Sequence, residues 1–291
     1  MNAIRVPASA GGARRRRDGR PVPAGGLTGR LRSLRTAGIA VLVCAGLAVA
    51  AQAVLGLAHV APFVVPPPSA VVRELAADPG LYLHDALVTL AEAAAGLALG
   101  VVLALAFAAA ALHSRLLDRV LTPLVVVSQT VPVIALAPLL VLWLGYGAVP
   151  RVVVCALIAF FPLAVTALQG LRATDPQLLL LLRSLDASAW FVFWRVRVPG
   201  AAPYFAAGLR TGATLSLVGA VVAEWTGADA GLGYLVLSAN ARLATAQAFA
   251  AIVLITLLGL AAYAGVALLE RRVCWWTAPA LPVPASPKGP A

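Results

Sequence analysis

Lysine is almost absent from this 291-residue sequence. Lys288, close to the C-terminus, is the only lysine among the 22 basic residues. A Walker A loop needs Gly-Lys-Ser/Thr after a strand, whereas Lys288 is followed by Gly and Pro, so this chain has no P-loop. A Ser-Lys catalytic pair inside a membrane is excluded for the same reason.

Cysteine and histidine are also scarce, with three of each. Cys44, Cys155 and Cys274 lie far apart and show neither a CxxC pair nor the spacing of zinc ligands. No HExxH motif occurs. We therefore expect inert thiols and no metal site.

Charged residues make up only 11% of the chain, against about a quarter in an average soluble domain. Hydrophobic residues make up 62% and fall in blocks long enough for a helix to cross a bilayer. Continuous Ala/Leu/Val runs favour helices over a barrel. The sequence therefore predicts an all-α, polytopic membrane protein with about six transmembrane helices. The expected spans are 37–58, 86–111, 120–144, 150–170, 205–226 and 247–269.

The first 35 residues are rich in Gly, Pro and Arg, with four arginines at 14–17. Such a segment buries too little apolar surface to order itself, so we interpret residues 1–35 as a disordered, basic cytoplasmic tail. A nucleic-acid-binding arm is the alternative, and we favour a tail that sets topology, with no nucleic-acid partner. Residues 36–275 are then the transmembrane domain, and residues 276–291 a flexible C-terminal tail.

Loop arginines predict the orientation, because cytoplasmic loops of membrane proteins are enriched in Lys and Arg. Placing both termini in the cytoplasm puts most arginines inside. The inside then holds the tail and Arg115, Arg119, Arg172, Arg183, Arg195, Arg197, Arg271 and Arg272, and the outside holds Arg73, Arg151 and Arg242.

The longest inside loop, residues 171–204, is unusually rich in aromatic and basic residues. Asp175 followed by Pro indicates a helix start. The chain should turn near Asp186 and Ala187, after which Ser188 can cap a second short helix that Pro199 stops.

On that second helix Trp190, Phe193, Trp194 and Arg197 have the spacing of one helix face. An aromatic stripe that ends in Arg is typical of a docking surface, since Trp and Arg are enriched at interface hot spots. A helix lying on the inner leaflet would show the same pattern, and the residues alone do not separate the two interpretations. The partial alternation of FVFWRVRV also allows a strand, which has no evident partner.

The loop resembles the EAA-x3-G-x9-I-x-LP loop of permease subunits of bacterial ABC importers. The EAA positions fall on Leu180, Leu181 and Leu182, the Gly on Asp186, the Ile on Val196, and LP on Val198 and Pro199. Further stretches are similar to the nitrate, taurine and aliphatic sulfonate permeases. They are LRSLDASAWFVFWRVRVPGAAPYFAAGLRTG, PLLVLWLGYG, VVAEW…GLGYLV and LLERRVCWW, in the family's order between residues 55 and 276.

The resemblance implies a type I ABC importer permease of a bacterial inner or plasma membrane, whose second loop helix couples to a separate cytoplasmic ATPase. It also implies a solute-binding protein outside, a homodimer, and no cofactor of its own, with ATP used by the partner. Leu180 replaces the family's acid, and Asp186 its turn glycine, although Asp tolerates the left-handed conformation better than most residues. The expected coupling residues are Leu180, Leu182, Asp186, Ala187, Ser188, Trp190, Phe193, Trp194, Arg197 and Pro199.

Several polar residues within the apolar spans are candidates for the pathway or its gate. Gln129 and Thr130 lie in a span bent by prolines, and Thr214 and Ser216 in the fifth span; each pair either lines a pathway or hydrogen-bonds another helix. Intramembrane acids are functional by default. We expect Glu92 and Glu224 near outer helix ends, where water or headgroups reach them. For Glu224 the resemblance implies a structural or outer-gate role.

Two GxxxG pairs, Gly96/Gly100 and Gly208/Gly212, predict close helix packing within the chain or across a dimer. The resemblance to sulfonate, taurine and nitrate permeases implies a small anion as substrate. An ATP-independent secondary carrier and a membrane-anchored interaction protein are the alternatives. The first would need polar midplane residues in inverted repeats, which the sequence does not show, and the second would not need the aromatic docking helix.

Overall fold

The computed structural model describes parts of residues 39–58, residues 61–113 except 62, residues 119 and 123, and residues 132–274. The expected tails, 1–35 and 276–291, lie outside these ranges. The chain divides into two units, residues 1–51 and 52–291, and the account below concerns the second. Every regular element in its described part is helical, which confirms the all-α prediction.

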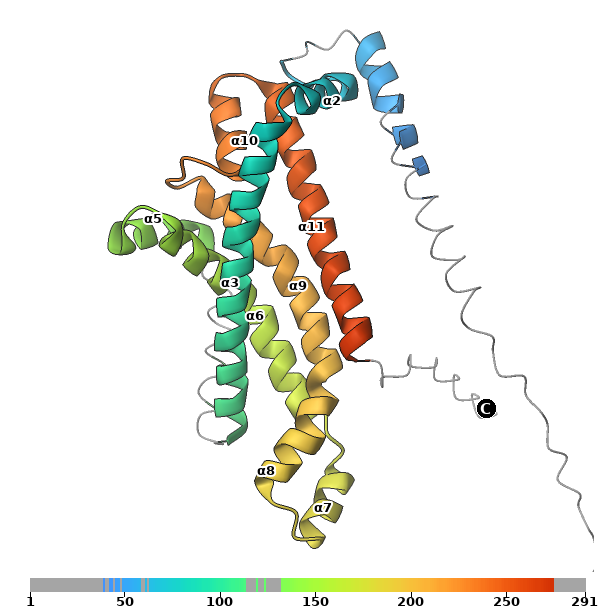
Figure 1. Cartoon of the computed structure of the whole chain (residues 1–291), viewed down its shortest axis with the longest axis vertical. Coiled ribbons are helices and arrows are strands. Elements are labelled where there is room, and N and C mark those ends of the chain that lie inside the picture. The colour runs from blue at the N-terminus through green and yellow to red at the C-terminus, as the bar shows by residue number, and fades with distance from the viewer. Residues whose placement is uncertain are drawn as a thin grey trace, which may run out of the picture. The chain divides into compact units, whose positions relative to one another are not determined.

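Three long helices pack together as the core (Figure 1). α3 (Pro79–His113) and α9 (Val198–Glu224) both pack against α6 (Ala148–Arg172). α6 contacts both of the others, and its Val154, Cys155, Ala159 and Leu163 are almost fully buried. Small residues dominate the core because van der Waals packing, not the hydrophobic effect, holds helices together in lipid.

The predicted glycine pairs lie where α3 and α9 contact α6. A Cβ atom at Gly96 would lie 2.9 Å from the Val152 carbonyl oxygen, and one at Gly100 would lie 3.1 Å from that of Ala156. Gly208 lies against Thr166 in the same way, and a Cβ at Gly212 would be 3.2 Å from Leu163 Cγ. Only glycine permits the backbone approaches at Gly96 and Gly100 without movement of α6, whereas a Cβ at Gly208 or Gly212 would displace a side chain of α6.

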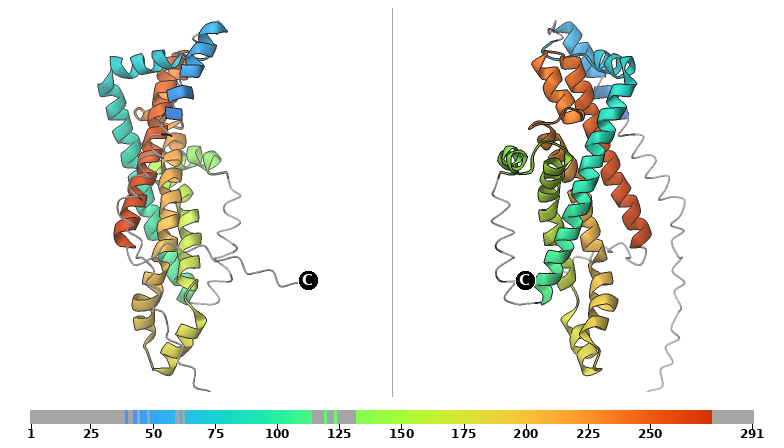
Figure 2. Two further views of the ribbon diagram at one scale, coloured as in Figure 1. Left: turned by 90° about the vertical axis from the view of Figure 1, so that its right-hand side faces the viewer. Right: turned by 60° about the vertical axis from the view of Figure 1, so that its left-hand side comes forward.

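The other helices surround this core (Figures 1 and 2). α11 (Thr245–Val273) packs on α9, and α10 (Leu232–Ala241) packs on α11 near the end where α2 (Pro68–Ala77) lies. α5 (Val133–Leu144) runs across the bundle against α6. α7 (Pro176–Ser184) and α8 (Ala189–Val192) form a hairpin at the opposite end from α2.

Four helical segments in the described part are long and apolar enough to cross a membrane: 79–112, 148–172, 189–224 and 245–273. They correspond to four of the about six expected spans. The first and third expected spans, 37–58 and 120–144, fall partly outside the described residues. Only the second half of the third is seen, as the twelve-residue α5.

Candidate functional site: the α7–α8 hairpin and a buried polar cluster

The α7–α8 hairpin begins and turns as its sequence predicts. The Asp175 carboxylate caps α7 by accepting a hydrogen bond from the Gln177 N–H at 2.8 Å, as expected from Asp-Pro. The helix then ends in a Schellman turn in which the Ala187 N–H donates to the Leu182 carbonyl at 3.0 Å. Asp186 has φ +53°, the left-handed conformation in which glycine would be strain-free. The predicted turn at Asp186 is therefore confirmed.

Ser188 caps the second helix as predicted, its hydroxyl accepting a hydrogen bond from the Phe191 N–H at 3.2 Å. The helix does not end at Pro199, which corrects our expectation. Residues Phe193–Arg197 form a π-helical turn in which the Val198 N–H donates to the Phe193 carbonyl, and α9 follows directly. Proline lacks an N–H and is tolerated in the first turn after such a change of hydrogen bonding. α8, the π turn and α9 thus form one continuous helical segment, 189–224.

The π turn falls within the aromatic stripe. Trp190 and Trp194 are 73% and 48% exposed, and their rings meet edge to face with centroids 5.5 Å apart. The Phe193 ring also meets that of Trp194, with centroids 5.2 Å apart, and Phe193 packs against the core around Ala108 and Leu171. Trp190, Phe193 and Arg197 line one groove, so these three lie on a common side as the spacing predicts.

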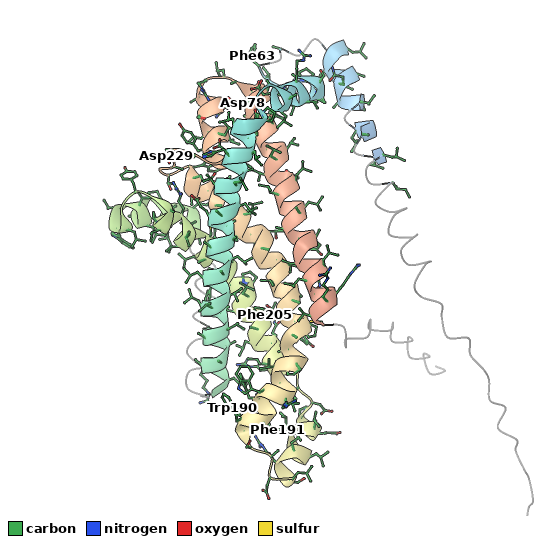
Figure 3. All side chains as sticks on the ribbon, viewed as in Figure 1. Phe63, Asp78, Trp190, Phe191, Phe205 and Asp229 are labelled. Carbon is green, nitrogen blue, oxygen red and sulfur yellow. The ribbon has the colours of Figure 1, made fainter. Side chains whose placement is uncertain are left out.

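Apolar side chains cover much of the hairpin surface. Trp190 and Phe191 lie at this end of the molecule, well beyond Phe205 on α9 (Figure 3). Leu180, at the position of the family's acid, is 63% exposed, Leu185 is 68% exposed, and Leu182 is half-buried. A groove of about 690 Å³ runs between the hairpin and the end of α3. Its lining is Ala109, Leu112, Leu179, Arg183, Ala187, Ala189, Trp190, Val192, Phe193 and Arg197.

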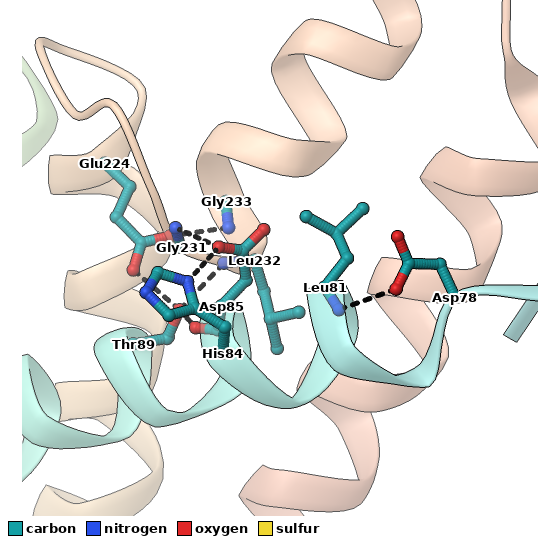
Figure 4. Close-up of polar contacts among 9 residues, drawn as sticks. All are labelled: Asp78, Leu81, His84, Asp85, Thr89, Glu224, Gly231, Leu232 and Gly233. Carbon is teal, nitrogen blue, oxygen red and sulfur yellow. Dashed lines mark hydrogen bonds and ion pairs between the residues drawn. The ribbon is translucent and has the colours of Figure 1, made fainter.

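A second site, a buried polar cluster, lies near the other end, where α9 meets α3 and α10 (Figure 4). Glu224, the last residue of α9, is 1% exposed. Its carboxylate accepts hydrogen bonds from the Thr89 hydroxyl at 2.7 Å and from the Gly233 N–H at 2.5 Å. The Thr89 oxygen accepts from the Leu232 N–H at 2.9 Å.

Asp85 completes this cluster by accepting a hydrogen bond from the Gly231 N–H at 3.2 Å, and it also contacts His84 Nδ1 at 3.2 Å. Three free N–H groups at the start of α10 are thus satisfied by side chains of α3 and α9. A helix start carries unsatisfied donors and partial positive charge, which acidic side chains stabilise. The cluster therefore fixes α10 to the core.

Sequence reasoning missed Asp85 and Thr89. The signal was present: residues 85, 89, 92, 96 and 100 share one face of α3, on which polar residues give way to glycine. Pairing that face with Glu224 required the tertiary structure.

Glu92 and Glu224 are both buried, which corrects the expectation that water reaches them. Glu92 is 5% exposed, and its carboxylate lies 2.7 Å from Arg151 Nε on α6. A buried carboxylate needs such a partner because it loses its hydration. Arg210 and Glu270 form a second interhelical pair, 2.8 Å apart, between α9 and α11.

The remaining candidates for the pathway differ from one another in burial and in hydrogen-bond partners. The Ser216 hydroxyl is buried and donates to the Ala93 carbonyl on α3 at 2.7 Å. Thr214 is half-exposed and donates to the Thr211 carbonyl of its own helix at 2.9 Å. Gln129 and Thr130 lie outside the described residues. Within the described ranges, no three His, Cys, Asp or Glu side chains are grouped to hold a metal ion.

Comparison with known proteins links these features to one family. The family model described as "binding-protein-dependent transport system inner membrane component" matches residues 96–274. A probable ABC transporter permease protein of Haemophilus influenzae is 39% identical over 213 residues, covering 73% of this chain and 87% of that protein. The formylaminopyrimidine transport permease protein ThiX of Halalkalibacterium halodurans is 36% identical, covering 74% and 86%. The putative aliphatic sulfonates transport permease protein SsuC of Bacillus subtilis is 32% identical, covering 77% and 82%.

Proposed function

Because this chain belongs to the family of binding-protein-dependent transport inner membrane components, the permeases of ABC importers, we propose that it forms the translocation pathway of such an importer as a homodimer. A cytoplasmic ATPase pair would hydrolyse ATP, and an extracytoplasmic binding protein would deliver a small solute. The chain itself would hold no catalytic group and no cofactor.

The exposed aromatic hairpin is the observation that supports an ATPase partner. Trp190, Phe191 and Trp194 expose large apolar surfaces in and just after α8, and Leu180 and Leu185 are exposed in and just after α7. Large exposed apolar surfaces mark interaction sites, and Trp is enriched where binding energy is concentrated. The hairpin is continuous with α9, so a protein bound there would act directly on a membrane-spanning helix.

The proposed orientation follows from the arginines. The hairpin carries Arg183, and the π turn that follows it carries Arg195 and Arg197, which by the positive-inside rule supports a cytoplasmic position for this end of the bundle. The α2–α10 end would then face outward and meet the binding protein. Both termini would be cytoplasmic.

Relatives carry names from two chemical classes. One is named for formylaminopyrimidine and another for aliphatic sulfonates. We propose that the solute of this chain belongs to one of these classes. Uptake of labelled formylaminopyrimidine, taurine, an aliphatic sulfonate and nitrate, measured with and without this chain in its native cell, decides between them.

Co-purification tests the ATPase partnership. The chain is extracted from its native membrane in mild detergent, as the unaltered protein and with both Trp190→Ala and Trp194→Ala. An ATPase subunit should accompany the unaltered chain and be lost from the double variant. Trp143→Ala is the matched control, since Trp143 is 69% exposed on α5, and this variant should retain the ATPase.

Two outcomes would contradict the proposal. If no ATPase co-purified with either the unaltered chain or the Trp143→Ala variant, the proposed ATPase partnership would be contradicted. Uptake that persists in vesicles depleted of ATP would instead indicate a secondary carrier.

A further inference from the structure

A hollow of about 470 Å³ opens on the side of α6, midway along its length. This volume lies within the range of small-molecule sites, about 300–1,000 Å³. The hollow is bounded by α5, α6 and α9. Its lining consists of Val133, Ile158, Phe161, Pro162, Val165, Thr166 and Leu215.

In the part of the chain that the structure describes, the hollow lies on the more exposed flank of the middle of α6. Phe161 and Val165 are half-exposed, whereas Leu163 and Ala164, on the opposite side of α6, are completely buried. Both α6 and the segment that carries Leu215 are long enough to cross the membrane. The hollow therefore lies at membrane depth.

The polar groups of the hollow are hydrogen-bond acceptors. Pro162 lies inside α6 and has no N–H, so the Ile158 carbonyl lacks its usual helical donor. The Thr166 hydroxyl donates to the Pro162 carbonyl at 2.7 Å, which leaves its oxygen lone pairs to accept. The Phe161 ring supplies a flat apolar surface. This chemistry suits a planar solute that donates hydrogen bonds.

The electrostatics of the hollow disfavour an anion. None of its seven lining residues is charged. Of the arginines on α6 and α9, Arg151 lies against Glu92 and Arg210 against Glu270, and Arg172 is the last residue of α6. An unpaired sulfonate or nitrate in an apolar site would lose its hydration without compensation.

We propose that this hollow, here called the α6 hollow, holds the transported solute during its passage, and that the solute is a small uncharged nitrogen heterocycle. The proposal rests on the transport function proposed above and specifies its substrate. Formylaminopyrimidine, for which one relative is named, belongs to the same chemical class.

Thiol labelling tests whether the α6 hollow is accessible to water, as a solute site in a transport pathway must be. Val165→Cys and Leu215→Cys are placed separately in the full chain, in native membrane vesicles opened to both sides. A charged methanethiosulfonate should label each at least tenfold faster than Leu260→Cys, a position 65% exposed on α11. The reagent reacts with thiols in water and not with thiols that face lipid. The unaltered chain gives the background from the native cysteines.

Protection identifies the class of solute. Formylaminopyrimidine should slow the labelling of Val165→Cys several-fold, and taurine should not. If Val165→Cys and Leu215→Cys were labelled no faster than Leu260→Cys, the α6 hollow would face lipid. That result would overturn the proposal. Protection by taurine alone, or by neither solute, would overturn the heterocycle assignment.

Uptake in the native cell separates this inference from the proposed function. Deletion of the chain should abolish formylaminopyrimidine uptake, Phe161→Ala should reduce it at least tenfold, and Phe249→Ala, a change on α11, should not. If deletion abolished sulfonate or taurine uptake instead, the proposed transport function would stand and the assignment of a heterocycle as solute would be wrong. If deletion changed the uptake of none of the four solutes, that assignment would also be wrong, and ATPase co-purification would still test the proposed function.

Discussion

Thr89 and Glu224 lie 135 residues apart in the chain, yet the Thr89 hydroxyl donates a buried hydrogen bond of 2.7 Å to the Glu224 carboxylate. This bond joins α3 to the end of α9. Glu224 also accepts from the Gly233 N–H, so the same carboxylate holds the start of α10. Three helices meet at one side chain.

Glu224→Gln should destabilise the chain by roughly 1–3 kcal/mol, since a buried donor would lose its acceptor. The amide of Gln offers only one accepting oxygen, whereas the carboxylate accepts from Thr89 on one oxygen and from Gly233 on the other. The melting temperature of the purified full chain in detergent measures the effect. Asp229→Asn makes the same change on an exposed residue and should leave the melting temperature unaltered. Equal melting temperatures for the two variants would contradict a structural role for the buried polar cluster.

Gly233→Ala should loosen α10 from the core. A Cβ atom there would lie 2.6 Å from the Val221 carbonyl oxygen, which is backbone and cannot rotate away. Limited proteolysis within residues 225–231 should become faster in this variant. Gly265→Ala is the control, because a Cβ at Gly265 meets nothing within 4 Å. That variant should equal or slightly exceed the unaltered chain in stability, since Ala is the better helix former. Similar cleavage of both variants would argue against the close contact.

Charge reversal tests the pair between α9 and α11. Arg210→Glu and Glu270→Arg should each lower the melting temperature, because each sets two like charges against one another near 2.8 Å. The double variant should recover most of the loss. The coupling energy of a partly exposed pair is about 1 kcal/mol or less, so the double-mutant cycle is the appropriate measurement. A cycle in which the two changes simply add would show that the residues do not interact.

Asp186→Gly should stabilise the hairpin by about 0.5–1 kcal/mol, because glycine adopts the left-handed conformation without steric cost. Asp186→Val should destabilise it, since a β-branched residue is poorly tolerated at φ +53°. The rate of hydrogen exchange at residues 182–188 reports the stability of the turn. If Gly and Val variants exchanged at the same rate, the turn would not depend on this backbone conformation.

The local features of the hairpin follow from its sequence, because they depend on few neighbouring residues. The Asp175 and Ser188 caps and the turn at Asp186 are determined by side chains within three or four positions. The long apolar runs likewise predict the helices that the described residues contain. The continuation of the helix through Pro199 could not be predicted in this way. Proline ordinarily ends an α-helix, but it is accommodated after a π turn, and the π turn has no clear sequence signature.

The buried polar cluster shows a different limit. Glu224 looks like a solvated helix end when only its own span is considered, because it stands at the last position of an apolar run. Its burial depends on α10 folding back and on Asp85 and Thr89 facing it from α3. Such pairings over more than a hundred residues depend on how the helices pack, and one sequence does not reveal them.

The continuous helical segment from Ala189 to Glu224 joins the two ends of the bundle. At about 1.5 Å per residue its 36 residues span roughly 54 Å, more than the hydrocarbon thickness of a bilayer. Trp190 lies near one end, and Glu224, with α10 attached, lies at the other. If the segment tilts as one body, a displacement imposed at Trp190 moves α10 at the same time. Opening on one side of the membrane and closure on the other would then be two phases of one movement.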